Sequence, residues 1–402
     1  MNIAVAQSGG PTCAINASLL GVLKEALKHK EIEHVYGSVN GIEGIINGLV
    51  VDLKEEIKTE EDMKILRATP STVLGSCRYK LPEFKDKPEV YETITECFNK
   101  YGIKAFFYIG GNDSMDTANK LSKYFKEQNI DIKVIGVPKT VDNDLCETDH
   151  TPGFGSAAKY VAATLQEITC DSSVYGVASV TIVEIMGRHA GWLAASTCVL
   201  HAIGLSSPHL VYLPESNFSL EQFYNDVEEQ LRLHKSVIVC ISEGIDLSTF
   251  GIDYTSGKVD NFGHKYLSGA GKALENLIGD KFGVKVRSIE LNVMQRSGSH
   301  IASKTDLDEA EAIGSAAVAA ALNGETGKMA LLKRISNNPY ICVTDTHDVR
   351  EVANLAKEVP QSMINENGDN VTEEFIEYVR PLIEGELSQL TVNGLPQHIK
   401  LG

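Results

Sequence analysis

Two aspartates in the segment Pro-Lys-Thr-Val-Asp-Asn-Asp, residues 138–144, have the spacing of a metal-assisted reaction centre. Asp142 and Asp144 alternate in an extended stretch after a short apolar run, so their carboxylates are expected to lie close together at a strand end. Phosphoryl transfer needs a divalent cation on the migrating group, which carboxylates hold, and a base that receives the proton of the attacking hydroxyl. Taken alone, the segment fits an ordinary Asx-rich turn equally well. Lys139 is either a surface countercharge or a contact to a phosphate.

Two Gly-Gly pairs follow apolar runs and precede helical patterns. Gly9-Gly10 and Gly110-Gly111 lack Cβ atoms, so the backbone can turn sharply and approach a phosphate at a helix N-terminus. One such pair is weak evidence, and neither fits the dinucleotide-binding or the Walker pattern. Helix capping accounts for one of the polar residues after the second pair but not for the whole cluster of Asn112, Asp113 and Ser114.

Three arginines stand beside glycines or other small residues in predicted loops. They are Arg78, Arg188 and Arg296. A single arginine is usually a solvated or salt-bridged surface group. Several on such loops of an acidic protein favour anion binding, because a guanidinium contacts phosphate through two parallel hydrogen bonds.

Short apolar runs rich in β-branched residues alternate with amphipathic segments along the chain. Residues 14–28 and 114–125 have the pattern of helices with one apolar face. The alternation predicts an α/β fold of largely parallel sheets covered by helices, with ligands bound beyond the carboxyl ends of the strands. The expected strands are residues 2–6, 104–109, 133–137, 180–185, 210–213, 236–241 and 340–343.

Two charged or capped segments are expected to serve packing or solvation only. The mixed charge run of residues 54–64 predicts a solvated helix or loop. Near the C-terminus, Thr372 followed by two glutamates predicts a helix start, and Pro381 predicts its end. This second segment is interpreted as packing, as a lid or as an interface.

Composition excludes several classes of protein. At 402 residues the chain is long enough for two or three domains, taking about 150 residues for each. The net charge of −17 argues against nucleic acid as a partner, and any bound anion must be held by locally gathered cations. No apolar stretch approaches the ~20 residues of a membrane span. The N-terminus lacks signal-peptide features, and the eight cysteines are scattered, so we expect a cytoplasmic protein without a zinc site or a disulfide framework.

Six motifs, in this order, resemble those of the 6-phosphofructokinases. The resemblance covers residues 1 to about 330, and residues 359–383 resemble the C-terminal extension of the diphosphate-using branch. It implies two Rossmann-like three-layer α/β domains with the substrate cleft between them. The implied donor-binding domain is residues 1–147 completed by 297–345, and the fructose 6-phosphate domain is residues 148–296 completed by 346–402. The motifs are Gly9-Gly10-Pro11, residues 74–78, 110–113, 138–144 and 186–188, and Glu243-Gly244.

The resemblance also implies the reaction and the residues that perform it. A phosphoryl group would pass to the 1-hydroxyl of fructose 6-phosphate, in glycolysis or gluconeogenesis, in a homodimer or homotetramer. Asp142 matches the catalytic base, while Asp144 and Asn112 lie at the position of Mg²⁺. Gly10 and Arg78 match contacts to the donor phosphates. The residues that match acceptor contacts are Thr140, Asp142, Met186, Gly187, Arg188, Glu243, Arg287 and Arg296.

Two charged residues indicate the donor. ATP-using members of the family generally have glycine where Asp113 and Lys139 stand. A carboxylate at Asp113 would project where the α-phosphate of a nucleotide lies, and the repulsion at ~4 Å is ~4 kcal/mol at an effective dielectric constant of ~20. Lys139 would supply a cation to the shorter donor or to the transition state. We therefore expect diphosphate as the donor, with Asp113 and Lys139 acting beside Asp142, and a reversible reaction.

The chain also departs from the family pattern. Asn112 stands where an aspartate usually helps to hold the metal, so Mg²⁺ would be held through water or mainly by other groups. Ser179 and Val293 stand where ATP-using bacterial enzymes place an intersubunit arginine and a histidine. The helix of residues 14–28 has no arginine, which predicts weak or absent allostery by nucleotides such as ADP.

Two other functions stay open at this point. One is an ATP-dependent 6-phosphofructokinase on the same scaffold, and the other is a non-catalytic sensor of phosphorylated sugars, against which the intact Asp142 argues. The absent fingerprint excludes a Rossmann dehydrogenase. The residues also leave open whether a larger ketose phosphate, such as sedoheptulose 7-phosphate, is a second acceptor.

Overall fold

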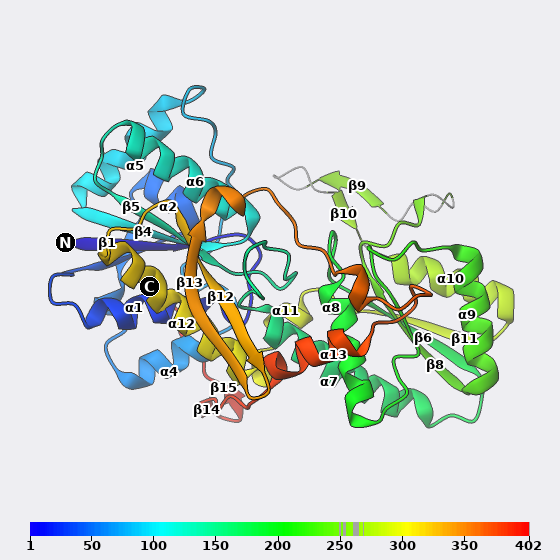
Figure 1. The fold of residues 1–402 in the computed structure, drawn as a ribbon. Helices are drawn as coiled ribbons and strands as arrows, with labels where there is room; N and C mark the ends of the chain where they lie inside the picture. Colours follow the sequence, from blue (N-terminus) through cyan, green and yellow to red (C-terminus); the bar gives the residue numbers. More distant parts are fainter. Residues whose placement is uncertain (249–250, 252–254, 260–264, 268, 402) are drawn as a thin grey trace.

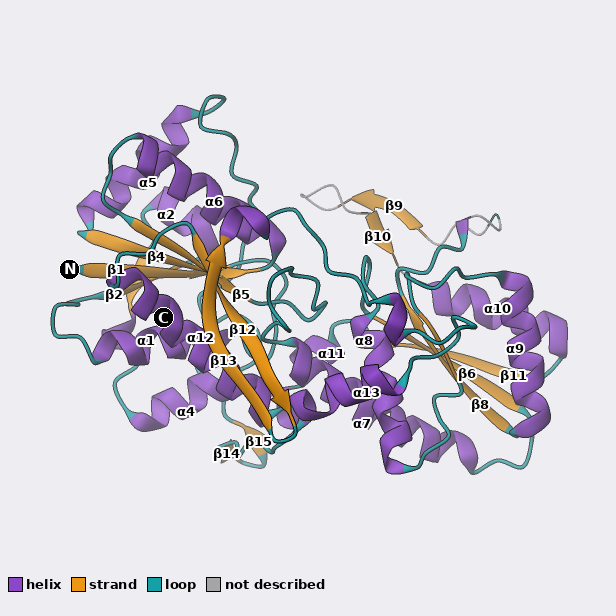
Figure 2. Ribbon diagram, viewed as in Figure 1, coloured by secondary structure: helices purple, strands orange, loops and turns teal. Residues whose placement is uncertain are grey.

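Two sheets lie side by side, each with helices on both faces (Figures 1 and 2). The computed structural model describes residues 1–401 apart from 249–250, 252–254, 260–264 and 268. The first sheet has seven strands in the order β13-β12-β5-β4-β1-β2-β3, and the second has four in the order β11-β6-β8-β7. The predicted α/β class with largely parallel sheets is confirmed.

The central strands of the first sheet are apolar except near their ends because helices cover both of their faces. Along β1, Ile3 and Val5 face the core beside α1 and α12, whereas Ala4 and Ala6 face the core beside α2, α5 and α6. β1, β2, β4, β5 and the start of β12 pair in parallel, so their carboxyl ends lie at one edge. The strands are β1 Asn2–Gln7, β2 Val35–Ser38, β3 Val50–Asp52, β4 Ile103–Gly110, β5 Lys133–Pro138, β12 Lys328–Asn337 and β13 Tyr340–Asp348.

The second sheet is wholly parallel. β6, β8, β7 and β11 pair in the same direction, and their carboxyl ends point toward the first body. One face packs against α7, α8 and α13, and the other packs against α9 and α10. The strands are β6 Ser179–Ile185, β7 Leu210–Tyr212, β8 Ser236–Ser242 and β11 Lys285–Glu290.

The helices lie close to their predicted positions where the apolar face is continuous. The helix predicted over residues 14–28 is α1, Ile15–Leu27, and the one predicted over 114–125 is α6, Asn112–Glu127. The charge run of residues 54–64 forms parts of two short helices, α3 and α4, as expected of a solvated segment. The other helices are α2 Gly41–Asn47, α3 Leu53–Glu56, α4 Glu60–Ala68, α5 Pro88–Lys100, α7 Phe154–Ser173, α8 Trp192–Ala195, α9 Leu220–Leu233, α10 Ala270–Phe282, α11 Met294–Ser297, α12 Lys304–Leu322 and α13 Glu373–Val379.

The structure adds strands that apolar runs did not predict. β2, β3, β11 and β12 carry polar or charged residues within short or partly exposed strands. The run predicted at residues 340–343 is the start of β13, which pairs antiparallel with β12 in a long hairpin rather than in a parallel unit. Small antiparallel pairs are formed by β9 Thr255–Val259 with β10 Lys265–Leu267 and by β14 Thr391–Val392 with β15 Leu395–Pro396.

The C-terminal region crosses between the two bodies. After β13 the chain passes from the first body to the second, where α13 begins after Thr372 and buries Phe375 and Val379 against the second core. This confirms the packing interpretation of the segment, although a 3₁₀ turn over Arg380–Ile383 carries the chain past Pro381. The tail returns, and Ile399 and Leu401 pack against the core of the first body.

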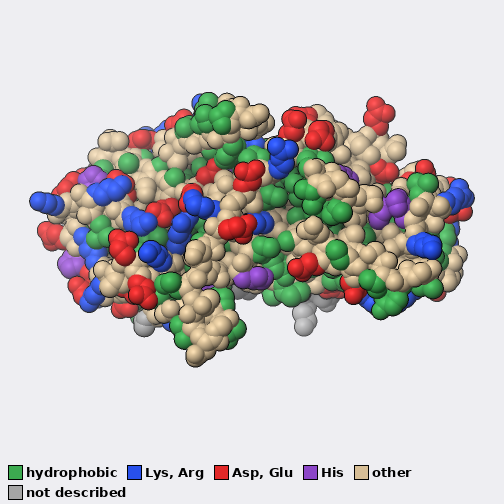
Figure 3. Space-filling model, turned by 90° about the horizontal axis from the view of Figure 1, so that it is seen from below, with side chains coloured by type: hydrophobic (Ala, Val, Ile, Leu, Met, Phe, Trp, Pro, Cys, Tyr) green, Lys and Arg blue, Asp and Glu red, His purple; other side chains and the backbone are tan. Residues whose placement is uncertain are grey.

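The surface carries charge of both signs. On the face seen from below, acidic and basic side chains are interspersed over the first body (Figure 3). Among the described helices, none has the length and apolarity needed to cross a membrane.

Candidate active site

The carboxyl ends of strands from both sheets meet around one cleft of about 620 Å³. The loops after β1, β4 and β5 line it from the first body, and the loops after β6, β8 and β11 line it from the second. This is where parallel sheets place ligands. Of the residues predicted to form the site, those that line the cleft are Gly10, Arg78, Asn112, Asp113, Lys139, Thr140, Asp142, Asp144, Met186, Arg188, Glu243 and Arg296.

Asp142 lies on a loop that is fixed by hydrogen bonds on both sides of it. Its backbone N–H donates to Thr140 Oγ1 at 3.1 Å, and the N–H of Thr151 donates to Asn143 Oδ1 at 3.0 Å. Burial raises the pKa of Asp142 to about 7, and Asp144 and Glu243 add to this effect, while Arg188 and Lys139 oppose it. A carboxylate with a pKa near neutrality is suited to accept a proton in a reaction at neutral pH.

Lys139 is buried, with 2% of its surface exposed, and its ammonium group lies against the first Gly-Gly loop. The ammonium donates to the carbonyl of Ser8 at 2.9 Å and to that of Gly10 at 2.6 Å. Burial lowers the pKa of Lys139 to about 7, and nearby arginines add to this, while the two aspartates of its loop oppose it. The interpretation as a surface countercharge is therefore wrong, because the side chain is buried and its ammonium group is hydrogen-bonded to the first Gly-Gly loop.

Asn112 and Asp144 face each other and present oxygen atoms suited to Mg²⁺. Asn112 Nδ2 donates to Asp144 Oδ2 at 3.4 Å, which leaves Asn112 Oδ1 directed elsewhere. That oxygen is enclosed and has no hydrogen-bond partner within the described part of the chain. An orphaned amide oxygen beside a carboxylate is the kind of donor set that Mg²⁺ prefers. The residues present therefore fit the metal despite the asparagine.

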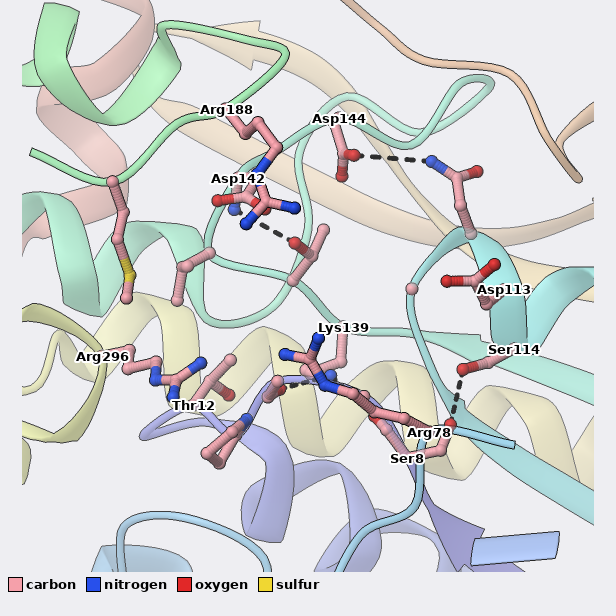
Figure 4. Close-up of a pocket in the computed structure, with 18 of the residues that line it drawn as sticks. Ser8, Thr12, Arg78, Asp113, Ser114, Lys139, Asp142, Asp144, Arg188 and Arg296 are labelled. Atoms are coloured by element: carbon pink, nitrogen blue, oxygen red, sulfur yellow. Dashed lines mark hydrogen bonds between the residues drawn. The ribbon is translucent and has the colours of Figure 1, made fainter. Parts of the chain in front are cut away.

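The Gly9-Gly10 loop is shaped for close approach to an anion. Gly9 has φ +75°, a conformation that favours glycine, and its carbonyl accepts a hydrogen bond from Ser76 Oγ at 2.7 Å. A Cβ at Gly10 would lie 3.1 Å from Arg296 Nη1, so the glycine leaves room for this arginine. Figure 4 shows Arg78 and Arg296 reaching toward this part of the cleft from opposite sides.

Asp113 lies in the first turn of α6, next to Asn112. The neighbouring Ser114 is hydrogen-bonded to Ser8 with 2.5 Å between the hydroxyl oxygens, which ties the second Gly-Gly loop to the first. The two loops and Lys139 thus form one continuous wall of the cleft (Figure 4).

The loop after β6 forms the opposite wall. The N–H of Met186 donates to Gln295 Oε1 at 3.2 Å, and the carbonyl of Gly187 accepts from Ser242 Oγ at 2.5 Å. Arg188 Nε is enclosed without a hydrogen-bond partner among the residues that the structure describes, as expected of a group that receives an external acceptor. Burial raises the pKa of Glu243 on the adjoining loop, while Arg188 opposes this effect.

Replacing Gly187 with alanine is expected to weaken acceptor binding. Gly187 has φ +142°, and an added Cβ would lie 2.5 Å from the carbonyl oxygen of Ala190, so the loop must move. Strain of this kind costs about 1–3 kcal/mol, which corresponds to a rise in the KM for the sugar phosphate of about 5-fold to about 150-fold. Steady-state kinetics would measure the effect. Gly204→Ala is the control, because Gly204 also has a positive φ but a Cβ there meets no atom within 4 Å; equal effects of both changes would contradict the prediction.

Arg287 and Gly187 are the predicted site residues that do not line the cleft. Gly187 lies behind Met186 and Arg188 in the same loop. Arg287 lies on β11, exposed, 3.4 Å from Asp171 in a shallow depression that also contains Ser179. It therefore does not join the other cations within its own chain.

Sequence reasoning missed several residues that line the cleft. His189 and Tyr79 directly follow Arg188 and Arg78, so they could have been found as neighbours of the motifs. Thr12 directly follows the Gly9-Gly10-Pro11 motif and could have been found in the same way, whereas Asn292 carries no local signal and reaches the cleft only where distant loops meet.

Comparisons with known proteins agree with this geometry. The sequence model described as "PFK: Phosphofructokinase" matches residues 2–321. Proteins named pyrophosphate–fructose 6-phosphate 1-phosphotransferase from Halomonas elongata and Methylococcus capsulatus are 40% and 39% identical to the chain, covering 100% of it and 96% of each of them. The crystal structure of a pyrophosphate-dependent phosphofructokinase from Nitrosospira multiformis, 35% identical, superposes with a TM-score of 0.87 over 99% of this chain and 96% of that one. The chain belongs to the phosphofructokinase family.

Proposed function

We propose that this enzyme transfers a phosphoryl group reversibly from diphosphate to the 1-hydroxyl of fructose 6-phosphate, giving fructose 1,6-bisphosphate and phosphate. The observation that carries the choice of donor is the buried Lys139, which lies between the first Gly-Gly loop and Asp142. The full-length relatives named for the same reaction support it. The reaction serves glycolysis or gluconeogenesis.

The donor lies against the wall built by the two Gly-Gly loops. Gly10 and Arg78 contact its phosphates, and Lys139 supplies a cation close to the bond that breaks. Asp113 sits at the same wall and repels the additional phosphate of a nucleotide. Diphosphate fits because it lacks the additional phosphate that would approach Asp113 in a nucleotide.

The acceptor lies against the opposite wall. Arg188, Arg296 and Glu243 orient the sugar phosphate, together with the main chain at Met186. Asp142 accepts the proton of the 1-hydroxyl as its oxygen attacks the donor phosphorus, and phosphate leaves. Thr140 keeps the carboxylate in place through the hydrogen bond of its hydroxyl with the Asp142 N–H.

Asp144 and Asn112 are the residues that would hold Mg²⁺. A bound ion would supply positive charge to the migrating phosphoryl group. The asparagine would contribute a neutral ligand in place of the aspartate found in most of the family.

Arg287 reaches a sugar phosphate only from a neighbouring subunit, because it lies outside the cleft of its own chain. This supports a homodimer or homotetramer in which Arg287 serves the acceptor site of the adjacent protomer. Guanidinium groups are well suited to contacts of this kind across an interface.

A donor comparison tests the proposed function. Purified enzyme with fructose 6-phosphate and Mg²⁺ is expected to turn over with diphosphate and to show less than about 1% of that rate with ATP, since the barrier set by charge repulsion is ~4 kcal/mol. The release of fructose 1,6-bisphosphate is measured for both donors at equal concentration. Comparable rates would favour an ATP-dependent kinase, and binding of sugar phosphate without turnover would favour a sensor.

A further inference from the structure

One residue of the C-terminal crossing segment holds the loop that follows Asp142. The backbone N–H of Lys357 donates to the carbonyl of Asp144 at 2.8 Å. Its ammonium donates to the carbonyls of Thr148 at 3.0 Å and Asp149 at 2.7 Å. Lys357 therefore fixes residues 144–149 at three points, directly after the catalytic and metal-binding positions.

The same segment is bonded to the acceptor loop of the second body. Trp192 Nε1 donates to the carbonyl of Lys357 at 2.9 Å, and the Lys357 ammonium lies 5.1 Å from the centre of the Trp192 ring. Two residues on, the N–H of Val359 donates to Glu215 Oε1 at 2.9 Å. The carboxylate of Glu215 also accepts the N–H of Gly191, at 2.9 and 3.1 Å.

Residues 357–359 thus connect the two walls of the cleft. Asp144 follows β5 of the first sheet, whereas Gly191 and Trp192 follow β6 of the second. The segment lies outside residues 2–321, the part of the chain that the family's sequence model matches. In Figure 1 it is the orange stretch that passes from the first body to the second.

We propose that Lys357 is a positioning residue that sets the separation between the donor-side loop of Asp142 and Asp144 and the acceptor loop. Phosphoryl transfer consists largely of positioning, so a displacement of ~1 Å between the two walls costs about 10²-fold in rate. Lys357 is not among the described residues that line the cleft. Its hydrogen bonds to the loop are observed, whereas its effect on the reaction rests on the proposed function.

Lys357→Met tests the proposal, because methionine keeps an unbranched side chain without donors. The expected result is a fall in kcat of about 10²-fold, with the KM for fructose 6-phosphate within about threefold of the original value. Amide hydrogen exchange of residues 144–151 in the enzyme without substrates is expected to quicken by about tenfold. Lys357→Arg is expected to recover at least about tenfold in kcat, since a guanidinium also donates to carbonyls and stacks on tryptophan.

Lys54→Met is the matched control. The Lys54 ammonium also donates to a main-chain carbonyl, that of Ile32 at 2.6 Å, but it lies outside the cleft. This variant is expected to keep kcat and the exchange of residues 144–151 unchanged. Equal losses in both variants, or a Lys357→Met enzyme with kcat within about threefold of the original, would overturn the proposal.

Trp192→Phe serves if Lys357→Met does not fold. It removes the Nε1 donor and keeps an aromatic ring against Lys357. A fall in kcat with the KM for fructose 6-phosphate retained supports the positioning role of Lys357, and an unchanged kcat overturns it. Absence of turnover with diphosphate in the original enzyme would instead contradict the proposed function. The hydrogen-exchange measurement on Lys357→Met would still decide whether Lys357 holds residues 144–149 in place.

Discussion

Asp142→Asn is expected to lower kcat by about 10³-fold, with the KM for fructose 6-phosphate within a few fold of the original. Asparagine has nearly the shape of aspartate, so the loop held by Thr140 and Thr151 should keep its conformation. It cannot accept the proton of the attacking hydroxyl, which removes general-base catalysis. Steady-state kinetics with diphosphate measures the loss.

A matched control for this variant is Asp86→Asn. Asp86 is exposed and lies outside the cleft, so the same change of charge there is expected to leave kcat unaltered. An Asp142→Asn enzyme that keeps kcat within about tenfold of the original would contradict the role of base.

The carboxylate of Asp142 is also expected to make kcat/KM depend on pH. Burial, Asp144 and Glu243 raise the pKa of Asp142 to about 7. Because the base must be unprotonated, its contribution to activity is present above this pKa and is lost as the pH falls through it. On the alkaline side activity is limited by Lys139, which must keep its proton and whose pKa burial lowers to about 7. The value of kcat/KM, corrected for the ionisation of the substrates, is expected to fall about tenfold per pH unit below about pH 7. A flat profile down to about pH 5.5 would show that the base titrates elsewhere.

The double variant Asp113→Gly with Lys139→Gly is expected to lose diphosphate-dependent turnover by about 10³-fold or more. The lysine is a buried cation at the donor wall, and its removal also leaves the carbonyls of Ser8 and Gly10 without their donor. The first Gly-Gly loop is then free to shift. Turnover with ATP is not expected to arise, because removing a repulsive carboxylate does not create a site for adenine.

The single variants separate the two contributions. Lys139→Gly is expected to account for most of the loss, since it removes both the charge and the support of the loop. The double variant Asp86→Gly with Lys87→Gly makes the same change in an exposed pair and is expected to keep activity. Retention of diphosphate turnover within about tenfold in the Asp113 and Lys139 double variant would show that the donor is recognised by other residues.

The sequence by itself determined the chemistry-bearing loops and their sheet edge. The apolar runs before Gly9, Gly110 and Pro138 predicted strands, and the observed parallel pairing places their loops together. Residue types and order made Asp142, Asp144 and Lys139 candidates, because each lies within a short contiguous motif, although the segment alone fitted an Asx-rich turn equally well. A contiguous motif can be recognised in the sequence without knowing which distant residues it contacts.

Tertiary structure alone decided what surrounds those residues. The position of Lys139 was decided by its hydrogen bonds to the carbonyls of Ser8 and Gly10, about 130 positions away along the chain. Arg287 carries a family match but lies exposed on β11 beside Asp171 of α7, away from the cleft, because the packing of the strand against this helix fixes where its side chain lies. No sequence motif marks the segment of residues 357–359 that connects the two walls of the cleft. Its hydrogen bonds go to main-chain carbonyls and to residues more than 140 positions away, and main-chain groups are the same in every sequence.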